Sequence, residues 1–61
     1  MKDQYEKIVE IDDPVLVDSF DHTGSFVGEI VGFSEGGNCC HVLFNERIYK
    51  GIHSKEITYW K

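Results

Sequence analysis

The glycines inside the central apolar run constrain this chain more than any other feature. Gly28 and Gly32 interrupt the segment Phe26–Phe33, which carries β-forming apolar residues on both of its alternating faces. Glycine within a strand often marks a bulge or a sharp bend, and a short sheet needs such bends in order to curl. The run therefore predicts a bent strand in a small, strongly curved β-sheet.

Further β-rich runs flank this bent strand and are separated by turn signals. The pair Asn45-Glu46 predicts a tight turn, and Ser54 is expected to cap a short 3₁₀ turn over His53–Ile57. Short strands at this spacing are typical of small all-β folds. The predicted strands are Val15–Phe20, Phe26–Phe33, Cys39–Phe44, Arg47–Ile52 and Thr58–Trp60.

Residues 1–13 precede the strands and are predicted to be an N-terminal arm. Their apolar residues, up to Ile11, fit either a helical stripe or the alternation of a strand, so both remain open. Pro14 ends any helix, because the residue before a proline avoids the helical region. We expect one domain over residues 14–61. Its predicted core residues are Val15, Val17, Ile30, Val42, Phe44 and Ile57.

Five short strands with one 3₁₀ turn before the last strand is also the plan of SH3-like barrels. The segments that carry this resemblance are Val15–Val17, Gly28–Val31, His41–Phe44 and Ser54–Ile57. Over residues 14–60 the chain resembles Tudor-like and KOW-like members more than the signalling SH3 domains that bind proline-rich peptides. The resemblance implies an all-β fold, a small five-stranded SH3-like barrel with one short 3₁₀ turn before the last strand, and a binding module.

The size and composition of the chain narrow its function and location. Its 61 residues allow one small core but not a deep catalytic cleft with a supporting shell, so we expect no enzyme. No apolar run approaches the ~20 residues of a membrane helix, and the first ten residues are polar, so we expect a cytoplasmic protein without membrane contact. Small chains like this are common among phage and prophage products, and such an origin is part of the expectation.

The net charge of −5 is unevenly distributed. Residues 1–35 carry nine acids and two bases, a balance of −7, whereas residues 36–61 carry two acids and four bases, a balance of +2. A solubilising surface would explain this asymmetry, but so would an acidic face that meets a basic protein partner. The candidate acidic face is Asp12, Asp13, Asp18 and Asp21. The alternative is a basic patch for nucleic acid, formed by Arg47, Lys50 and Lys55.

Aromatic side chains supply another candidate binding site. Tyr49, Tyr59 and Trp60 have polar tips that suit a half-exposed site at one end of the barrel, and filling of the core is the alternative. We predict a non-enzymatic protein-interaction module with a protein partner, and a nucleic-acid-associated Tudor-like or KOW-like barrel as the alternative.

The adjacent cysteines are the remaining candidates for chemistry. Cys39 and Cys40 cannot link distant parts of the chain, so both are expected to be free thiols, as in a reducing compartment. In a strand they point to opposite faces, with Cys40 on the core side and Cys39 beside His41. This spacing matches no zinc motif. We expect no metal, cofactor or catalytic residue, and a thiol- or metal-dependent protein is a distant third interpretation.

Overall fold

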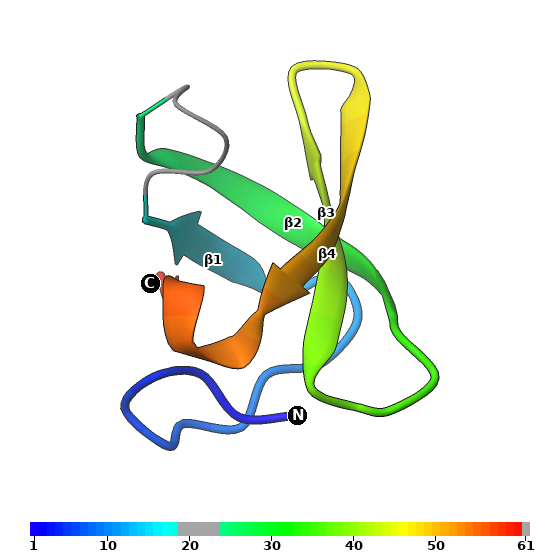
Figure 1. The fold of residues 1–61 in the computed structure, drawn as a ribbon. Helices are drawn as coiled ribbons and strands as arrows, with labels where there is room; N and C mark the ends of the chain where they lie inside the picture. The colour runs from blue at the N-terminus through cyan, green and yellow to red at the C-terminus, as the bar shows by residue number, and fades with distance from the viewer. Residues whose placement is uncertain (19–23, 61) are drawn as a thin grey trace.

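The chain folds into one antiparallel sheet. The computed structural model describes residues 1–18 and 24–60, and Figure 1 shows their arrangement. The elements are β1 (Pro14–Val17), β2 (Phe26–Phe33), β3 (Cys39–Phe44), β4 (Arg47–His53), the 3₁₀ turn η1 (Ser54–Glu56) and β5 (Ile57–Tyr59). The predicted all-β fold, with five strands and one 3₁₀ turn before the last, is confirmed. No helix among the described residues is long and apolar enough to cross a membrane.

Some predicted boundaries differ from the structure. The first strand was predicted to reach Phe20, but β1 ends at Val17, and Phe20 lies outside the described residues. The predicted cap, Ser54, is the first residue of η1, and the capping residue is His53. The Nδ1 atom of His53 accepts a hydrogen bond from the Lys55 N–H (3.1 Å). The imidazole nitrogen thus takes the role that a serine hydroxyl was expected to play.

The sheet has two edges and is not closed. Its strand order is β4-β3-β2-β1-β5, so β1 pairs with both β2 and β5. The strands β4 and β5 each have one neighbour in the sheet and are not paired with each other. The predicted closure into a barrel is therefore not confirmed, although the sheet is curved enough to enclose a core.

The β3–β4 hairpin owes its register to a two-residue turn. Asn45 and Glu46 both have positive φ angles, 52° and 64°, as a type I′ turn requires. This turn pairs Phe44 with Arg47 and Leu43 with Ile48. In Figure 1 the hairpin projects beyond the other strands and crosses β2.

Tight approach between β2 and β3 explains one of the two glycines in the bent strand. A Cβ atom at Gly28 would lie 2.5 Å from Cγ1 of Val42 and 2.6 Å from the carbonyl oxygen of Leu43. Only glycine lets the two strands cross this closely. The pairing of β2 with β3 then shifts between Ile30 and Gly32, so the expected irregularity of this strand is present.

The core lies on the inner face of the sheet. Five of the six predicted core residues are fully buried, whereas the prediction for Phe44 is wrong, because its side chain is 36 % exposed. Phe44 lies next to the hairpin turn, beyond the part of the sheet that covers the core, and stacks on Phe26 (4.7 Å between ring centroids). The buried apolar residues are Val9, Val15, Val17, Phe26, Ile30, Cys40, Val42, Ile52 and Ile57.

The N-terminal segment packs against this core. Residues 1–13 contain neither a helix nor a strand and form one isolated bridge, between Lys2 and Ile8. Val9 is fully buried in the core, and its N–H donates to the carbonyl oxygen of Met1 (2.9 Å). In Figure 1 this segment runs below η1 at the N-terminal end of the chain. The segment therefore contributes to the core, which the charge and apolar pattern of the arm did not indicate.

Candidate functional site

Apolar side chains are exposed on the outer face of β2, β3 and β4, the face opposite the core. Leu43 is 37 % exposed and lies directly across from Ile48, which is 53 % exposed. Val27 (37 % exposed) lies on the neighbouring strand, diagonally from Leu43, and is paired with Leu16 of β1. We call Val27, Val31, Leu43 and Ile48 the outer apolar face.

Charged and polar groups lie within and beside the outer apolar face. Glu29 lies between Val27 and Val31 on the exposed side of β2 and pairs with Leu43 of β3. The exposed Lys50 follows Ile48 on β4. His41 lies opposite Gly32 and is half-buried. Its Nδ1 atom is buried and has no hydrogen-bond partner among the described residues. The face thus combines exposed apolar side chains with an acidic group, Glu29, among them and a basic group, Lys50, beside them.

The N-terminal segment covers the β5 edge of the sheet. The Gln4 N–H donates to the carbonyl oxygen of Ile57 (3.0 Å), and the Tyr59 N–H donates to Oδ2 of Asp3 (2.7 Å). The other carboxylate oxygen of Asp3 accepts from the N–H groups of Tyr5 (2.8 Å) and Lys7 (2.9 Å). Asp3 is buried, at 6 % exposure. One carboxylate therefore closes the N-terminal loop and occupies an outward-facing donor of β5.

Opposing effects set the pKa of Asp3. Burial raises it, whereas the hydrogen bonds from the backbone of Tyr59, Lys7 and Tyr5 lower it, as does the positive charge of Lys7. The hydrogen bonds prevail, so the pKa of Asp3 lies below its ordinary value of 3.8. Asp3 is not among the site residues that the sequence predicted. The available signal was an aspartate two residues before Tyr5, a spacing at which its side chain can bind a backbone N–H.

The β4 edge, in contrast, is open among the described residues. In a hairpin with a two-residue turn, the flanking pair, Phe44 and Arg47, is hydrogen-bonded, and the next pair is not. The N–H and C=O of Ile48 therefore point away from β3. No hydrogen bond joins them to another described residue. The irregular pairing at Gly51, whose φ is 73°, limits the regular part of this edge to its first residues.

The candidate acidic residues lie at both ends of β1. Asp12 and Asp13 precede the strand, and Asp13 Oδ2 accepts from the Glu10 N–H (2.8 Å). Asp18 follows the strand and accepts from the side-chain amide of Gln4 (2.8 Å). At about 3.3 Å per residue, Asp13 and Asp18 are roughly 17 Å apart, which exceeds a Debye length in physiological salt. Asp21 lies outside the described residues.

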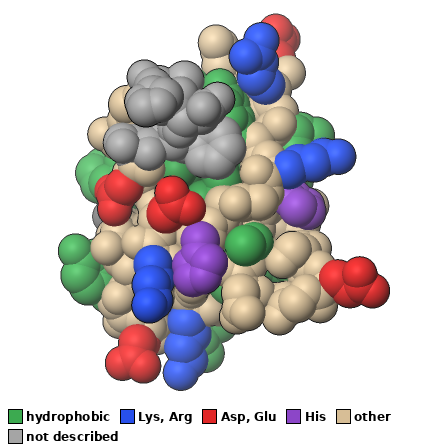
Figure 2. All heavy atoms as spheres, in the orientation of Figure 1, with side chains coloured by type: hydrophobic (Ala, Val, Ile, Leu, Met, Phe, Trp, Pro, Cys, Tyr) green, Lys and Arg blue, Asp and Glu red, His purple; other side chains and the backbone are tan. Residues whose placement is uncertain are grey.

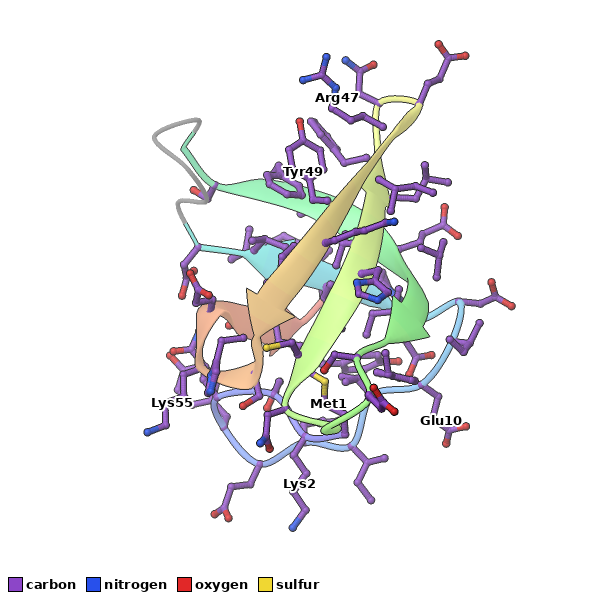
Figure 3. The ribbon with its side chains drawn as sticks, turned by 45° about the vertical axis from the view of Figure 1, so that its right-hand side comes forward. Met1, Lys2, Glu10, Arg47, Tyr49 and Lys55 are labelled. Atoms are coloured by element: carbon purple, nitrogen blue, oxygen red, sulfur yellow. The ribbon has the colours of Figure 1, made fainter. Side chains whose placement is uncertain are left out.

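The candidate basic residues are also separated. Arg47 is at the hairpin turn, Lys50 is in β4, and Lys55 is in η1. Figure 3 shows Arg47 and Lys55 at opposite ends of the molecule. In Figure 2, basic side chains alternate with acidic ones on the visible face. The structure therefore does not gather these three residues into one patch.

The candidate aromatic residues have different neighbours. Tyr49 packs against Phe26 (4.9 Å between ring centroids). Tyr59 lies under Lys7, whose Nζ is 5.3 Å from the ring centroid. Trp60 is 50 % exposed. The structure thus brings Tyr49 together with Phe26 and Phe44, near the hairpin turn, and places Tyr59 beside the N-terminal segment.

The cysteines differ in burial, as their alternation in β3 predicted. Both are free thiols, with Cys39 half-buried and Cys40 fully buried. Burial raises the pKa of Cys40 to about 11, and the neighbouring Cys39 and Glu56 add to this effect electrostatically. Among residues 1–18 and 24–60, no group of three or more His, Cys, Asp or Glu side chains is placed to hold a metal ion, and no pocket is present.

Comparisons with protein-family models, with curated proteins and with solved structures found no match. The surface of this chain therefore carries the evidence for its function.

Proposed function

We propose that this chain is a non-enzymatic, SH3-like protein-interaction module that binds a protein partner through the outer apolar face. The observation that carries the proposal is the exposure of four apolar side chains on adjoining strands, Val27, Val31, Leu43 and Ile48. Several apolar side chains exposed on one face of a small domain mark a contact surface. The strand order and the 3₁₀ turn before β5 are compatible with an SH3-like module.

The charges around the face favour a protein partner over a nucleic acid. A polyanion needs several basic groups on one surface, and Arg47, Lys50 and Lys55 are spread over the molecule. Glu29 lies within the outer face and would repel phosphates. A fitting partner would present apolar groups opposite these side chains, an acidic group opposite Lys50 and a hydrogen-bond donor or base opposite Glu29.

The test compares variants that remove apolar surface with variants that change charge. The variant Val27→Thr with Leu43→Thr places threonine, which is β-branched and compatible with a strand, at both positions. It removes apolar contact area from the outer apolar face. The matched control is Ile8→Thr with Ile11→Thr, because these side chains are as exposed but lie in the N-terminal segment. Each chain is used to capture partners from an extract of the source cell. The protein retained by the wild type is then purified for calorimetry.

We expect the outer-face variant to raise the Kd by about tenfold or more and the control to leave it within about twofold. Binding should have a negative heat-capacity change, because apolar surface is buried. If the control weakens binding as much as the outer-face variant does, the contact surface is not the outer apolar face.

A nucleic-acid-associated module remains the second candidate, carried by the excess of basic residues after residue 36. Under this alternative, Arg47→Glu with Lys50→Glu would abolish binding to mixed DNA and RNA. Asp13→Lys with Asp18→Lys would strengthen it by removing repulsion from phosphates. Under the protein-binding proposal, neither charge variant changes the Kd as much as the outer-face variant does. An acidic contact face would instead be revealed by a slower association rate in the Asp13→Lys, Asp18→Lys chain.

A further inference from the structure

The first nine residues of the N-terminal segment form a loop that is closed by its own hydrogen bonds. The Val9 N–H donates to the carbonyl oxygen of Met1 (2.9 Å). The Asp3 N–H donates to the carbonyl oxygen of Lys7 (2.8 Å), and the Asp3 carboxylate accepts from the Lys7 N–H (2.9 Å). These bonds lie entirely within residues 1–9, so they do not depend on which sheet the loop packs against.

The contacts that hold this loop on the sheet are made with residues far away in the sequence. The Gln4 N–H donates to the carbonyl oxygen of Ile57 (3.0 Å). The Asp3 carboxylate accepts from the Tyr59 N–H (2.7 Å), and the Val9 side chain is fully buried in the core. None of these contacts requires the loop and the sheet to belong to the same chain.

A tight turn over residues 10–13 connects the loop to β1. The Asp13 N–H donates to the carbonyl oxygen of Glu10 (3.1 Å), and the Glu10 N–H donates to Oδ2 of Asp13 (2.8 Å). Asp12, the third residue of this turn, has a φ of 75°. A type II turn has such a φ at its third residue and favours glycine there, so the closed turn is strained at Asp12. Opening the turn would release this strain.

We propose that the loop of residues 1–9 exchanges between two copies of this chain, so that the loop of each copy covers the β5 edge of the other. The occupant of the edge is the one that the structure already shows there, supplied by a second chain. Each contact described above is then remade between the copies, and the strain at Asp12 is relieved. Exchange of an identical element is a low-cost route to a dimer. The proposal goes beyond the proposed function and does not depend on it.

Competition from the chain's own loop limits the strength of this dimer. A short connection holds a bound element at an effective concentration on the order of 1 mM, and the second copy has to compete with it. Each copy also carries a net charge of −5, which opposes the approach of two copies. We therefore expect a monomer in dilute solution and a dimer with a Kd on the order of 1 mM. Sedimentation equilibrium up to about 2 mM would measure this Kd.

The test changes the turn and leaves the exchanged contacts intact. Asp12→Gly relieves the strain of the closed turn, whereas Asp12→Val increases it, because a β-branched residue rarely adopts a positive φ. Asp12→Asn is intermediate, since asparagine tolerates this conformation better than valine does. All three variants remove the same exposed charge. Glu35→Val is the matched control, because it makes the same change in charge and adds a valine at an exposed turn residue whose φ is not positive.

NMR of a mixed dimer shows whether the loop has crossed to the other copy. Isotope-labelled and unlabelled chains are mixed in equal amounts at high concentration and left to equilibrate. We expect NOEs between chains that connect Asp3 and Gln4 of one copy with Ile57 and Tyr59 of the other. These are the residues that the hydrogen bonds of the monomer bring together. A dimer formed through any other surface would lack these interchain NOEs and would overturn the proposal.

We expect the Kd of the Asp12→Val dimer to be at least about tenfold lower than that of Asp12→Gly, with Asp12→Asn between them. Glu35→Val should retain the wild-type Kd. If the Asp12→Val chain does not fold, the Asp12→Asn and wild-type chains must still dimerise more strongly than Asp12→Gly. Equal Kd values for the Asp12 variants would overturn the proposal. So would chains that all stay monomeric at about 2 mM.

Discussion

The two edges of the sheet differ in how they are built and in what they leave exposed. The β5 edge is covered by residues from the other end of the chain, since Asp3 accepts a hydrogen bond from the N–H of Tyr59, 56 positions away. The β4 edge belongs to a local hairpin and leaves Ile48 53 % exposed. The comparison shows that this small fold uses its N-terminal segment to protect one edge. Among the described residues, the other edge of the sheet has no such cover.

The largest expected effect is on the covered edge. Asp3→Ala removes the acceptor of three backbone N–H groups, and buried donors left without partners cost about 1–3 kcal/mol each. Water will hydrate some of them, so we expect a loss of about 3 kcal/mol in the free energy of unfolding. Most of the stability of so small a domain would be lost. Urea titration measures this, with the exposed Glu10→Ala as control. A midpoint equal to that of Glu10→Ala would mean that Asp3 does not hold the edge.

A smaller effect is expected near the open edge. Phe44 is 36 % exposed and stacks on Phe26, so Phe44→Ala should cost about 1–2 kcal/mol, not the roughly 3–5 kcal/mol of a core phenylalanine. Ile30→Ala, at a fully buried position, should cost more. Thermal melts of both variants would compare them. Complete unfolding of the Phe44→Ala chain under conditions where Ile30→Ala stays folded would mean that Phe44 contributes to stability as a core residue does.

Acid should weaken the covered edge selectively. The pKa of Asp3 in the folded chain lies below 3.8, so its ionised carboxylate stabilises the fold above about pH 4. This stabilisation is lost as the pH falls through the folded-state pKa. The difference in stability between the wild type and Asp3→Asn should therefore be largest near neutral pH and shrink below about pH 4. Urea midpoints between about pH 2 and pH 7 provide the measurement. A difference that does not vary with pH would contradict the role of the charge.

The open edge should tolerate change. Ile48→Thr keeps a β-branched side chain at an exposed position, and we expect it to alter the free energy of unfolding by no more than about 0.5 kcal/mol. Amide hydrogen exchange in dilute monomer sharpens the comparison directly. The Ile48 amide should exchange rapidly and the Tyr59 amide slowly, because of the two only the Tyr59 amide has an acceptor, Asp3, among residues 1–18 and 24–60. Equal protection of the two amides would remove the distinction between the edges.

The smallest expected effect is a difference between the alkylation rates of the two cysteines, which involves no change in stability. Cys40 pairs with Ile52 of β4, is fully buried and has a pKa raised to about 11, whereas Cys39 is half-buried. Alkylation of the native protein at about pH 8 should therefore modify Cys39 before Cys40. Mass spectrometry after timed quenching would separate the two rates. Equal rates would indicate that β4 separates from β3 on the timescale of labelling. The pairing of these two strands would then be less stable than the structure indicates.

Local patterns predicted the strands well and the N-terminal segment poorly. The bounds of β2 and β3 match those read from alternation, and Asn45-Glu46 gave the hairpin turn. These features depend on residues close together in the chain. Phe44 was misplaced because alternation reports the side of the strand but not whether the sheet extends far enough to cover the side chain. Asp3 was missed because its partner, Tyr59, is at the far end of the sequence.

The candidate sites show the same contrast between what nearby residues determine and what the folded sheet determines. The sequence identified charged and aromatic residues by type, but their grouping depended on where the strands placed them. Asp13 and Asp18 fell at opposite ends of β1, and Tyr49 and Tyr59 acquired different neighbours. The outer apolar face could have been suspected from the apolar residues on both faces of β2. Its exposure became apparent only when the described residues left that face uncovered.

The sequence by itself therefore determined the all-β class, the strands, the hairpin turn and the side of β3 on which each cysteine lies, because backbone preference and side-chain alternation act over a few residues. Tertiary structure decided that Val9 joins the core, that a buried aspartate covers β5 and that no described residue covers the edge of β4. Those outcomes depend on contacts between distant parts of the chain, and only the folded sheet brings them together.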